Sequence, residues 1–305
     1  GERRGGLTEQ AERGIRALAA GRTDAEEFAN LEEVVAAVAG QIASGKIMHT
    51  GAPVPWPALA GVLPAIPQGE ITVLAGLPGA GKSAVMWQIV RHVGMDSLAS
   101  GGEVLVYSME MVDVQVVLRG LIMEVRSIAA AQREVKPHRV DGYGLGELTA
   151  GGGGQALSDA LDTLAALPVR IAREQSLSTG QLIASMTRAL RDGERRGKPL
   201  KLVAIDYLQL LRFSSALKQH EAIEDAVNAI KRWASSTQVA VLLLSGIGRS
   251  GVATDPNEPP RASSMLGGSA IERTAAVMLI VHRPHVVDKR EPAGKAMLVI
   301  AKNRY

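Results

Sequence analysis

The chain has 305 residues, of which 46% are hydrophobic and 21% are charged, and it contains no cysteine. The absence of cysteine excludes a disulfide framework, a cysteine-ligated zinc site, an iron–sulfur centre and a thiol nucleophile. The formal net charge is only +3, so contact with nucleic acid must depend on where charges are placed. No apolar run approaches the ~18 residues of a membrane span, and the first residues lack a signal-peptide core. A cytoplasmic protein without membrane contact is therefore predicted.

Residues 7 to about 45 are rich in Ala, Glu and Arg, and their apolar residues recur at helical spacing. An interruption at residues 21–24 predicts two helices, whose narrow apolar stripes need a partner surface. Five prolines between residues 51 and 69 then predict an extended connector. The chain is accordingly divided into a helical arm, residues 1–50, and a larger domain, residues 51–305.

From Glu70 onward, short and almost entirely apolar runs alternate with longer amphipathic stretches. The runs comprise residues 71–75, 104–108, 169–172, 202–205, 239–244, 276–281 and 296–301. Strands that are apolar on both faces and separated by helix-length segments are typical of a mainly parallel sheet with helices on both faces. The last two runs are close together, which favours an antiparallel pair. The predicted fold class is therefore α/β.

A phosphate-binding loop follows the first apolar run. The residues from Gly76 to Ser83 match G-x-x-x-x-G-K-[ST] between a predicted strand and a helical pattern. Glycines let backbone N–H groups converge on phosphate oxygens, and the helix N-terminus adds a favourable dipole. Lys82 is expected to reach the β- and γ-phosphates of ATP or another nucleoside triphosphate, and Ser83 to ligate Mg²⁺. The predicted nucleotide contacts from this loop are Gly76, Pro78, Gly79, Ala80, Gly81, Lys82, Ser83 and Ala84.

Two carboxylates follow predicted strands. Asp206 comes directly after the apolar run 202–205 and is predicted to act on the Mg²⁺ side through water. Glu110, at the mouth of the second strand, is predicted to be the base that positions water on the γ-phosphate. The plainer alternatives are a helix cap or turn for Asp206 and an exposed turn residue for Glu110.

Glu110 within Tyr-Ser-Met-Glu-Met and Asp206 within Ile-Asp-Tyr-Leu-Gln-Leu-Leu, in this order behind the phosphate loop, resemble the DnaB-type replicative helicases. The resemblance covers about residues 50–305. It implies a RecA-like P-loop NTPase motor that forms a hexameric ring and unwinds DNA while moving on single-stranded DNA. It also implies that residues 1–50 are a linker arm docking on the adjacent subunit, without the family's helical N-terminal domain. Primase and a helicase loader are further implied partners.

Basic residues near the chain end match this family in two places. Lys302 and Arg304, in Lys-Asn-Arg, are similar to the motif that presents a basic residue to a neighbouring subunit's nucleotide. Both are therefore predicted to be catalytic across an interface, where an arginine would stabilise transition-state charge. Arg283 resembles an arginine near the nucleotide. A basic patch near a chain end and a surface salt bridge are the respective alternatives.

The chain departs from the family after its fifth apolar run. The family usually reads Leu-Ser-Gln there, with the glutamine sensing the γ-phosphate, but this chain has Leu244, Ser245 and Gly246. Glycine has no side-chain donor, so binding of ATP should persist while coupling of hydrolysis to movement is in doubt, unless Ser245 or Arg249 substitutes.

Two loops are expected to face DNA. Arg212 and Lys218 follow the Asp206 strand and suit contact with single-stranded DNA. The second loop lacks the family's usual arginine and glutamate, but its glycines leave main-chain N–H groups accessible to phosphate; its predicted contacts are Leu266, Gly267, Gly268 and Ser269. A denser basic cluster, residues 188–201, also contains acidic residues and is interpreted as a solvated helix end.

Two other functions share many of these features. A RadA- or RecA-type recombination ATPase has the same fold and, for RadA, a similar Lys-Asn-Arg ending, but the missing cysteines argue against RadA's usual zinc module. An oligomeric protein that binds ATP for assembly or loading, without unwinding DNA, would explain Gly246 and the altered DNA loop.

Overall fold

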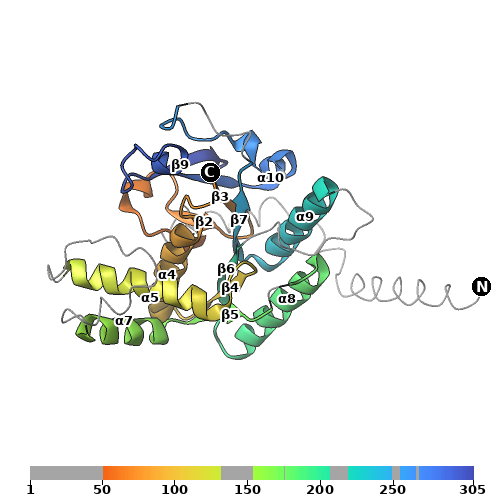
Figure 1. Cartoon of the computed structure of the whole chain (residues 1–305). Coiled ribbons are helices and arrows are strands. Elements are labelled where there is room, and N and C mark those ends of the chain that lie inside the picture. The colour runs from red at the N-terminus through yellow and green to blue at the C-terminus, as the bar shows by residue number, and fades with distance from the viewer. Residues whose placement is uncertain (1–50, 132–153, 175, 207–218, 249–254, 266–267) are drawn as a thin grey trace, which may run out of the picture. The chain divides into compact units, whose positions relative to one another are not determined.

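The computed structural model describes residues 51–131, 154–174, 176–206, 219–248, 255–265 and 268–305 (Figure 1). Residues 1–50, and with them the predicted helical arm, lie outside the described residues. The division of the chain into an arm and a motor domain therefore stays a prediction.

A seven-stranded sheet forms the centre of the described domain, with the order β5-β4-β6-β7-β3-β8-β9. All its neighbouring strands are parallel except β8 and β9, which are antiparallel. The strands are β3 (Ile71–Gly76), β4 (Glu103–Ser108), β5 (Val169–Ala172), β6 (Leu200–Asp206), β7 (Ala240–Gly246), β8 (Val277–His282) and β9 (Met297–Asn303). The predicted α/β class and the predicted antiparallel pair are both confirmed.

Helices cover both faces of the sheet (Figure 1). One face carries α4 (Lys82–Ser100), α5 (Asp113–Ala131) and α7 (Gly154–Ala166), and the other carries α8 (Thr179–Arg195) and α9 (Gln219–Thr237). Every residue of β3, β4 and β8 is buried, because helices exclude water from both sides. The remaining helical segments are η1 (Pro57–Leu59), η4 (Ala262–Ser264), α10 (Gly268–Thr274) and α11 (Pro284–Val287).

The proline-rich segment is not the extended connector that its composition predicts. It forms a two-stranded antiparallel sheet, β1 (Gly51–Pro53) and β2 (Ala65–Pro67), and buries Leu63 and Ile66. Pro53 and Pro67 end these strands and Pro57 begins η1, positions that a missing N–H tolerates. The side-chain amide of Asn303 donates to the carbonyl of Val62 over 2.7 Å, which ties this segment to β9.

The strand register brings the carboxyl ends of five parallel strands together. Gly76 of β3 pairs with Gly246 of β7 and with Val281 of β8, and Ser108 of β4 pairs with Asp206 of β6. Ligands of open α/β sheets bind outside the carboxyl ends of the strands. The phosphate loop and both candidate carboxylates leave the sheet at this edge, which is called the carboxyl edge below.

Candidate nucleotide-binding site

The phosphate loop joins the carboxyl end of β3 to the first turn of α4. Gly79 and Gly81 have φ angles of 76° and 102°, which L side chains rarely adopt, although a Cβ at either position would meet open space. Gly76 is required for a different reason, since a Cβ there would lie 2.7 Å from the carbonyl oxygen of Val281. Two glycines are thus required for their backbone conformation and a third for close packing. Together they shape a loop that leads directly into the N-terminus of a helix.

Lys82 lies across the loop that precedes it. Its Nζ donates to the carbonyls of Gly76 and Leu77 over 3.0 and 3.2 Å. Burial lowers the pKa of Lys82, and the nearby carboxylates Asp206 and Glu110 partly offset this effect. The ammonium group is therefore held at the loop by backbone carbonyls, within the field of both candidate carboxylates.

Ser83 and Asp206 contact each other at the carboxyl edge. Ser83 Oγ donates to Asp206 Oδ2 over 2.7 Å, while Asp206 Oδ1 is buried and has no hydrogen-bond partner among the described residues. Burial raises the pKa of Asp206, an effect that the Ser83 hydrogen bond and the Lys82 charge oppose. A buried carboxylate oxygen without a partner beside a serine hydroxyl fits a hard cation.

The ligand set at this position suits Mg²⁺ with most of its coordination from water and phosphate. No group of three or more His, Cys, Asp or Glu side chains arranged to hold a metal occurs within the described residues. A single carboxylate and a hydroxyl are what Mg²⁺ takes from proteins in phosphate sites. The residues present therefore fit the predicted ion.

Glu110 lies two residues beyond the end of β4 and is exposed. Its neighbour Met109 donates its backbone N–H to the carbonyl of Asp206 over 2.6 Å, which fixes the two strand ends side by side. Glu110 also acts electrostatically on both Lys82 and Asp206. The structure thus brings together Lys82, Ser83, Glu110 and Asp206, as the sequence predicts.

Arg119 of α5 is a member of this site that the sequence analysis missed. It lines a small hollow together with Ser83, Trp87 and Asp206, and its charge opposes the burial effect on Asp206. The available signal was that Arg119 is the lone charge between Asp113 and Glu124 in an otherwise apolar helix face. That signal indicates an unusual position but not which strand end it faces.

Lys302 and Arg304 lie at the opposite edge of the sheet from the phosphate loop. Because β9 is antiparallel to β8, Asn303 pairs with Val277 at the beginning of β8. The strand length from there to the carboxyl edge is about 17 Å. Lys302 donates to the carbonyl of Glu272, and Arg304 donates to that of Arg273 over 2.6 Å. Both therefore bind the last carbonyls of α10, not the loop of their own chain.

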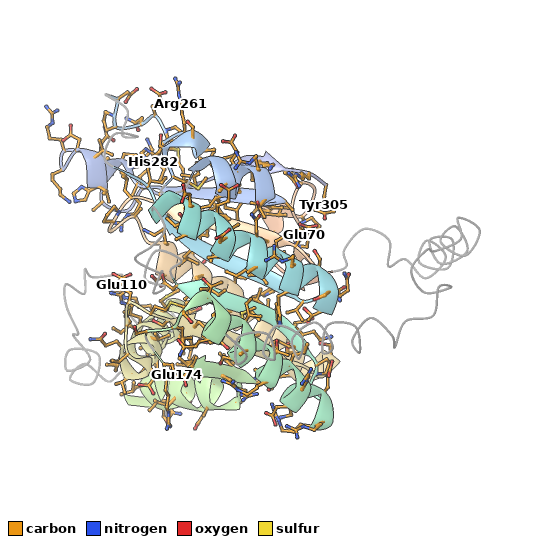
Figure 2. All side chains as sticks on the ribbon, turned by 90° about the vertical axis from the view of Figure 1, so that its right-hand side faces the viewer. Glu70, Glu110, Glu174, Arg261, His282 and Tyr305 are labelled. Carbon is orange, nitrogen blue, oxygen red and sulfur yellow. The ribbon has the colours of Figure 1, made fainter. Side chains whose placement is uncertain are left out.

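Figure 2 shows this separation: Tyr305 and Glu70 lie on one side of the domain, whereas Glu110 lies on the other. Arg283 differs from Arg304, because it directly follows β8 at the carboxyl edge. Its Nη2 donates to the carbonyl of Ala293 over 2.6 Å. Arg283 is thus near the loop in the fold, and its role there stays a prediction.

Gly246 ends β7 directly beside Gly76, at the level where the phosphate loop begins. The position is suitable for sensing phosphate, but the residue has no side chain to do so. Arg249 and the predicted DNA contacts Arg212, Lys218, Leu266 and Gly267 lie outside the described residues. Gly268 and Ser269 begin α10.

A parallel α/β sheet with a phosphate loop at its carboxyl edge and a serine–aspartate pair behind it defines a RecA-like P-loop nucleotide-binding domain. The profile of the DnaB-like helicase C terminal domain matches residues 55–305, so the chain belongs to that family, one of ATP-dependent helicases. Among the described residues, no helix has the length and apolar character needed to cross a membrane.

Proteins related to this chain in sequence include replicative DNA helicases. The replicative DNA helicase DnaB of Helicobacter pylori J99 is 24% identical over 93% of this chain and 55% of its own length. That of Mycoplasma pneumoniae is 23% identical over 78% of this chain and 49% of its own length. The chain thus spans about half the length of these curated relatives.

Solved structures confirm the fold. The ATPase domain of G40P superposes with a TM-score of 0.73 at 20% identity, covering 91% of this chain and 92% of that one. A DnaB-like replicative helicase, studied with its interactions with primase, superposes with a TM-score of 0.74 at 22% identity, covering 90% of this chain and 63% of that one.

Proposed function

We propose that this chain is the motor of an ATP-dependent, ring-forming helicase that moves along single-stranded DNA during replication. One observation carries the proposal: Lys82, Ser83, Glu110 and Asp206 gather at the carboxyl edge, whereas Lys302 and Arg304 lie at the opposite edge. A chain that presents the two parts of a hydrolytic site on opposite sides is complete only when copies associate head to tail.

The residues of the phosphate loop would bind and orient the nucleotide. Backbone N–H groups at Gly79 to Ser83 would cradle the phosphates, with Ala84 completing the first turn of α4. Lys82 would exchange its carbonyl contacts at Gly76 and Leu77 for the β- and γ-phosphates. Ser83 and Asp206 would hold the cation, and Mg²⁺ bound there neutralises phosphate charge.

Glu110 would act on water. Its exposed carboxylate acts electrostatically on Lys82 and Asp206 and can accept a proton from a water that attacks the γ-phosphate. Arg119 would supply positive charge behind Asp206. Arg304 of an adjacent copy would stabilise the charge that develops on the transferring phosphoryl group, and comparable arginines are worth roughly 10³–10⁵ in rate.

Contact with single-stranded DNA is assigned to the two segments that the sequence predicts to face DNA. One follows Asp206 and contains Arg212 and Lys218, and the other leads to Gly268 at the start of α10. Sequence-independent contact with phosphate suits a translocating motor. A hexamer is proposed from the resemblance to ring helicases. The related helicase studied with primase makes primase a proposed partner.

The test measures ATPase activity with and without single-stranded DNA on protein whose oligomeric state is followed by light scattering. We expect ATP and DNA to favour a hexamer and DNA to stimulate hydrolysis, with Lys82→Ala inactive in both. If the hexamer hydrolyses ATP at the same rate with and without single-stranded DNA, the proposed translocase function is wrong.

Gly246 favours a second candidate, an ATP-binding assembly or loading protein that unwinds nothing. Tight ATP binding by an intact ring with negligible unwinding of a forked duplex would establish it. Strand exchange without unwinding would instead indicate a recombination ATPase. A robust unwinding rate dismisses both.

A further inference from the structure

A groove of about 840 Å³ runs between α8 and the β4–β5 edge of the sheet, away from the phosphate loop. It exists because β5 is the last strand on this side while α8 packs mainly over β6 and against α9. Small residues on α8, Ser185 and Ala189, leave the sheet uncovered beside the helix. The groove is thus part of the fold and is not formed by a mobile loop.

The floor of the groove is mainly apolar. Leu105 and Tyr107 of β4 form it together with Ala172 of β5. Tyr107 is 1% exposed and its hydroxyl donates to Ser185 Oγ over 2.9 Å, so the ring and its polar group are both already engaged. The floor offers apolar contact but no exposed aromatic face.

The rim carries excess positive charge. The lining residues include the arginines 170, 188, 191 and 195 but only two carboxylates, Asp192 and Glu194. Arg188, Arg191 and Arg195 are spaced by three and four residues and therefore share one face of α8. The basic cluster at residues 188–201 is therefore not only the solvated helix end that the sequence predicts, because half of its cations line a concave surface.

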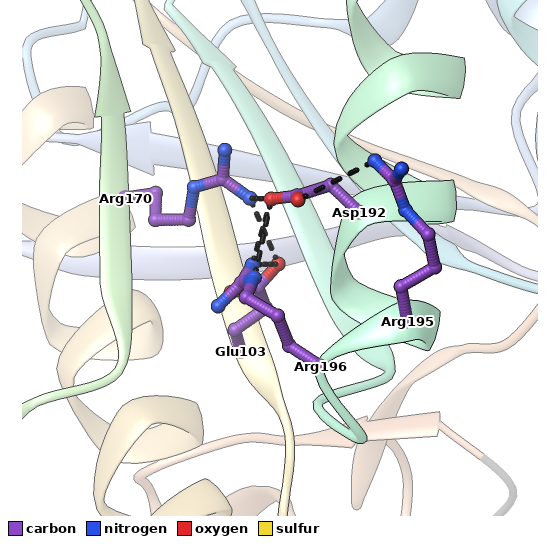
Figure 3. Close-up of polar contacts among 5 residues, drawn as sticks. All are labelled: Glu103, Arg170, Asp192, Arg195 and Arg196. Atoms are coloured by element: carbon purple, nitrogen blue, oxygen red, sulfur yellow. Dashed lines mark hydrogen bonds and ion pairs between the residues drawn. The ribbon is translucent and has the colours of Figure 1, made fainter.

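Two carboxylates near this rim, Asp192 and Glu103, are already neutralised, whereas Glu194 has no ion pair among the described residues. Asp192 pairs with Arg170 at 3.1 Å, Arg196 at 3.2 Å and Arg195 at 3.6 Å, and the buried Glu103 binds both Arg170 and Arg196 (Figure 3). By contrast, neither Arg188 nor Arg191 has an ion-pair partner in the part of the chain that the structure describes. These two guanidinium groups remain available to an anionic ligand.

We propose that this groove binds an acidic peptide segment of a partner protein. The rim arginines 188 and 195 are about 10 Å apart along the helix, and carboxylates three residues apart in a polyproline II segment share one face at a similar spacing of about 9 Å. An apolar residue between them would reach the floor. Single-stranded nucleic acid fits less well, because it binds by stacking on exposed aromatic residues and Tyr107 is buried.

The test uses the full chain and a fluorescein-labelled peptide of four Glu-Leu-Ser repeats, whose carboxylates recur every third residue. Anisotropy is measured at ionic strength near 0.1 M, with a Gln-Leu-Ser peptide and a labelled oligothymidine as comparison ligands. We expect the acidic peptide to bind at least about tenfold more tightly than the neutral one.

Two variants separate the groove from general electrostatic attraction. Arg188→Glu/Arg191→Glu should weaken binding at least tenfold, and Ala172→Trp should weaken it severalfold by filling the floor without changing charge. Arg126→Glu, on the exposed side of α5, is the matched control and should leave binding within twofold. The proposal is wrong if the acidic peptide fails to bind, if the groove variants bind as wild type, or if only oligothymidine depends on Arg188 and Arg191.

Discussion

The hydroxyl of Ser83 donates a 2.7 Å hydrogen bond to Asp206, although 123 positions of sequence separate them. The bond engages Oδ2 and leaves Oδ1 buried, with no hydrogen-bond partner in the part of the chain that the structure describes. Asp206 is 2% exposed, so its charge is costly unless a cation accompanies it. Protonation of Asp206 and binding of a cation beside Ser83 and Asp206 are therefore expected to compete.

Asp206→Asn is expected to stabilise the metal-free protein near pH 7. Burial raises the pKa of Asp206 above its ordinary value of about 3.9. Below that value both folded and unfolded forms are protonated and the penalty is absent. As the pH rises above it, the unfolded form ionises while the folded form still holds its proton, so stability falls until the pH passes the raised folded-state pKa and stays lower from there on. The variant should melt above wild type at pH 7, and the gap should shrink towards pH 4.

Thermal melts of wild type, Asp206→Asn and a surface control, Asp162→Asn, across this pH range measure the effect without added Mg²⁺. The control residue is exposed on α7, so it should show no such gap. A constant difference between wild type and Asp206→Asn from pH 4 to pH 7 would contradict the role of burial.

Glu110→Gln is expected to preserve nucleotide binding and to lower the ATPase rate by about 10²–10⁴, the usual contribution of a general base. The amide keeps the size of the side chain but cannot accept a proton in the same way. Binding of a fluorescent ATP analogue and steady-state hydrolysis measure the two properties separately. Glu174→Gln, another exposed glutamate, should leave both unchanged; normal turnover by Glu110→Gln would remove Glu110 from the mechanism.

Arg304→Ala is expected to reduce hydrolysis in the assembled ring by at least 10³-fold while each subunit still binds ATP. The arginine lies too far from the phosphate loop of its own chain to act there. Mixing the variant with wild type should therefore inhibit wild-type subunits, which a defect confined to single chains does not do. Arg290→Ala, which removes only a local pair with Asp288, serves as the control.

Gly120→Ala is expected to destabilise the packing of α5 on α4. A Cβ at Gly120 would lie 2.4 Å from the ring of Trp87, and overpacking of this kind costs typically 1–3 kcal/mol. Gly180→Ala in α8 meets nothing within 4 Å and should instead stabilise by up to about 1 kcal/mol. Denaturant unfolding measures the free energy of unfolding of the two variants. If both substitutions change it by the same amount in the same direction, helix propensity alone explains the effect and the Trp87 contact does not.

The sheet could be predicted from sequence because its strands are buried on both faces, so that runs such as 202–205 are continuous and easily seen. The phosphate loop could be predicted because its glycines meet strict backbone requirements. The role of Arg119 could not be predicted, because its position near Asp206 depends on how α5 packs over the sheet. The hairpin of residues 51–67 was misjudged because prolines at strand ends resemble those of a connector.

The contacts of Lys302 and Arg304 link these two residues to α10. Both side chains satisfy carbonyls at the C-terminal end of α10, while its first residue, Gly268, adjoins the predicted DNA loop. A side chain that extends away from α10 to a group outside its own chain would leave those carbonyls without this donor. If Lys302 or Arg304 contacts a nucleotide on another copy, as proposed above, the C-terminal end of α10 loses a hydrogen-bond donor, and α10 is the helix that begins beside the predicted DNA loop.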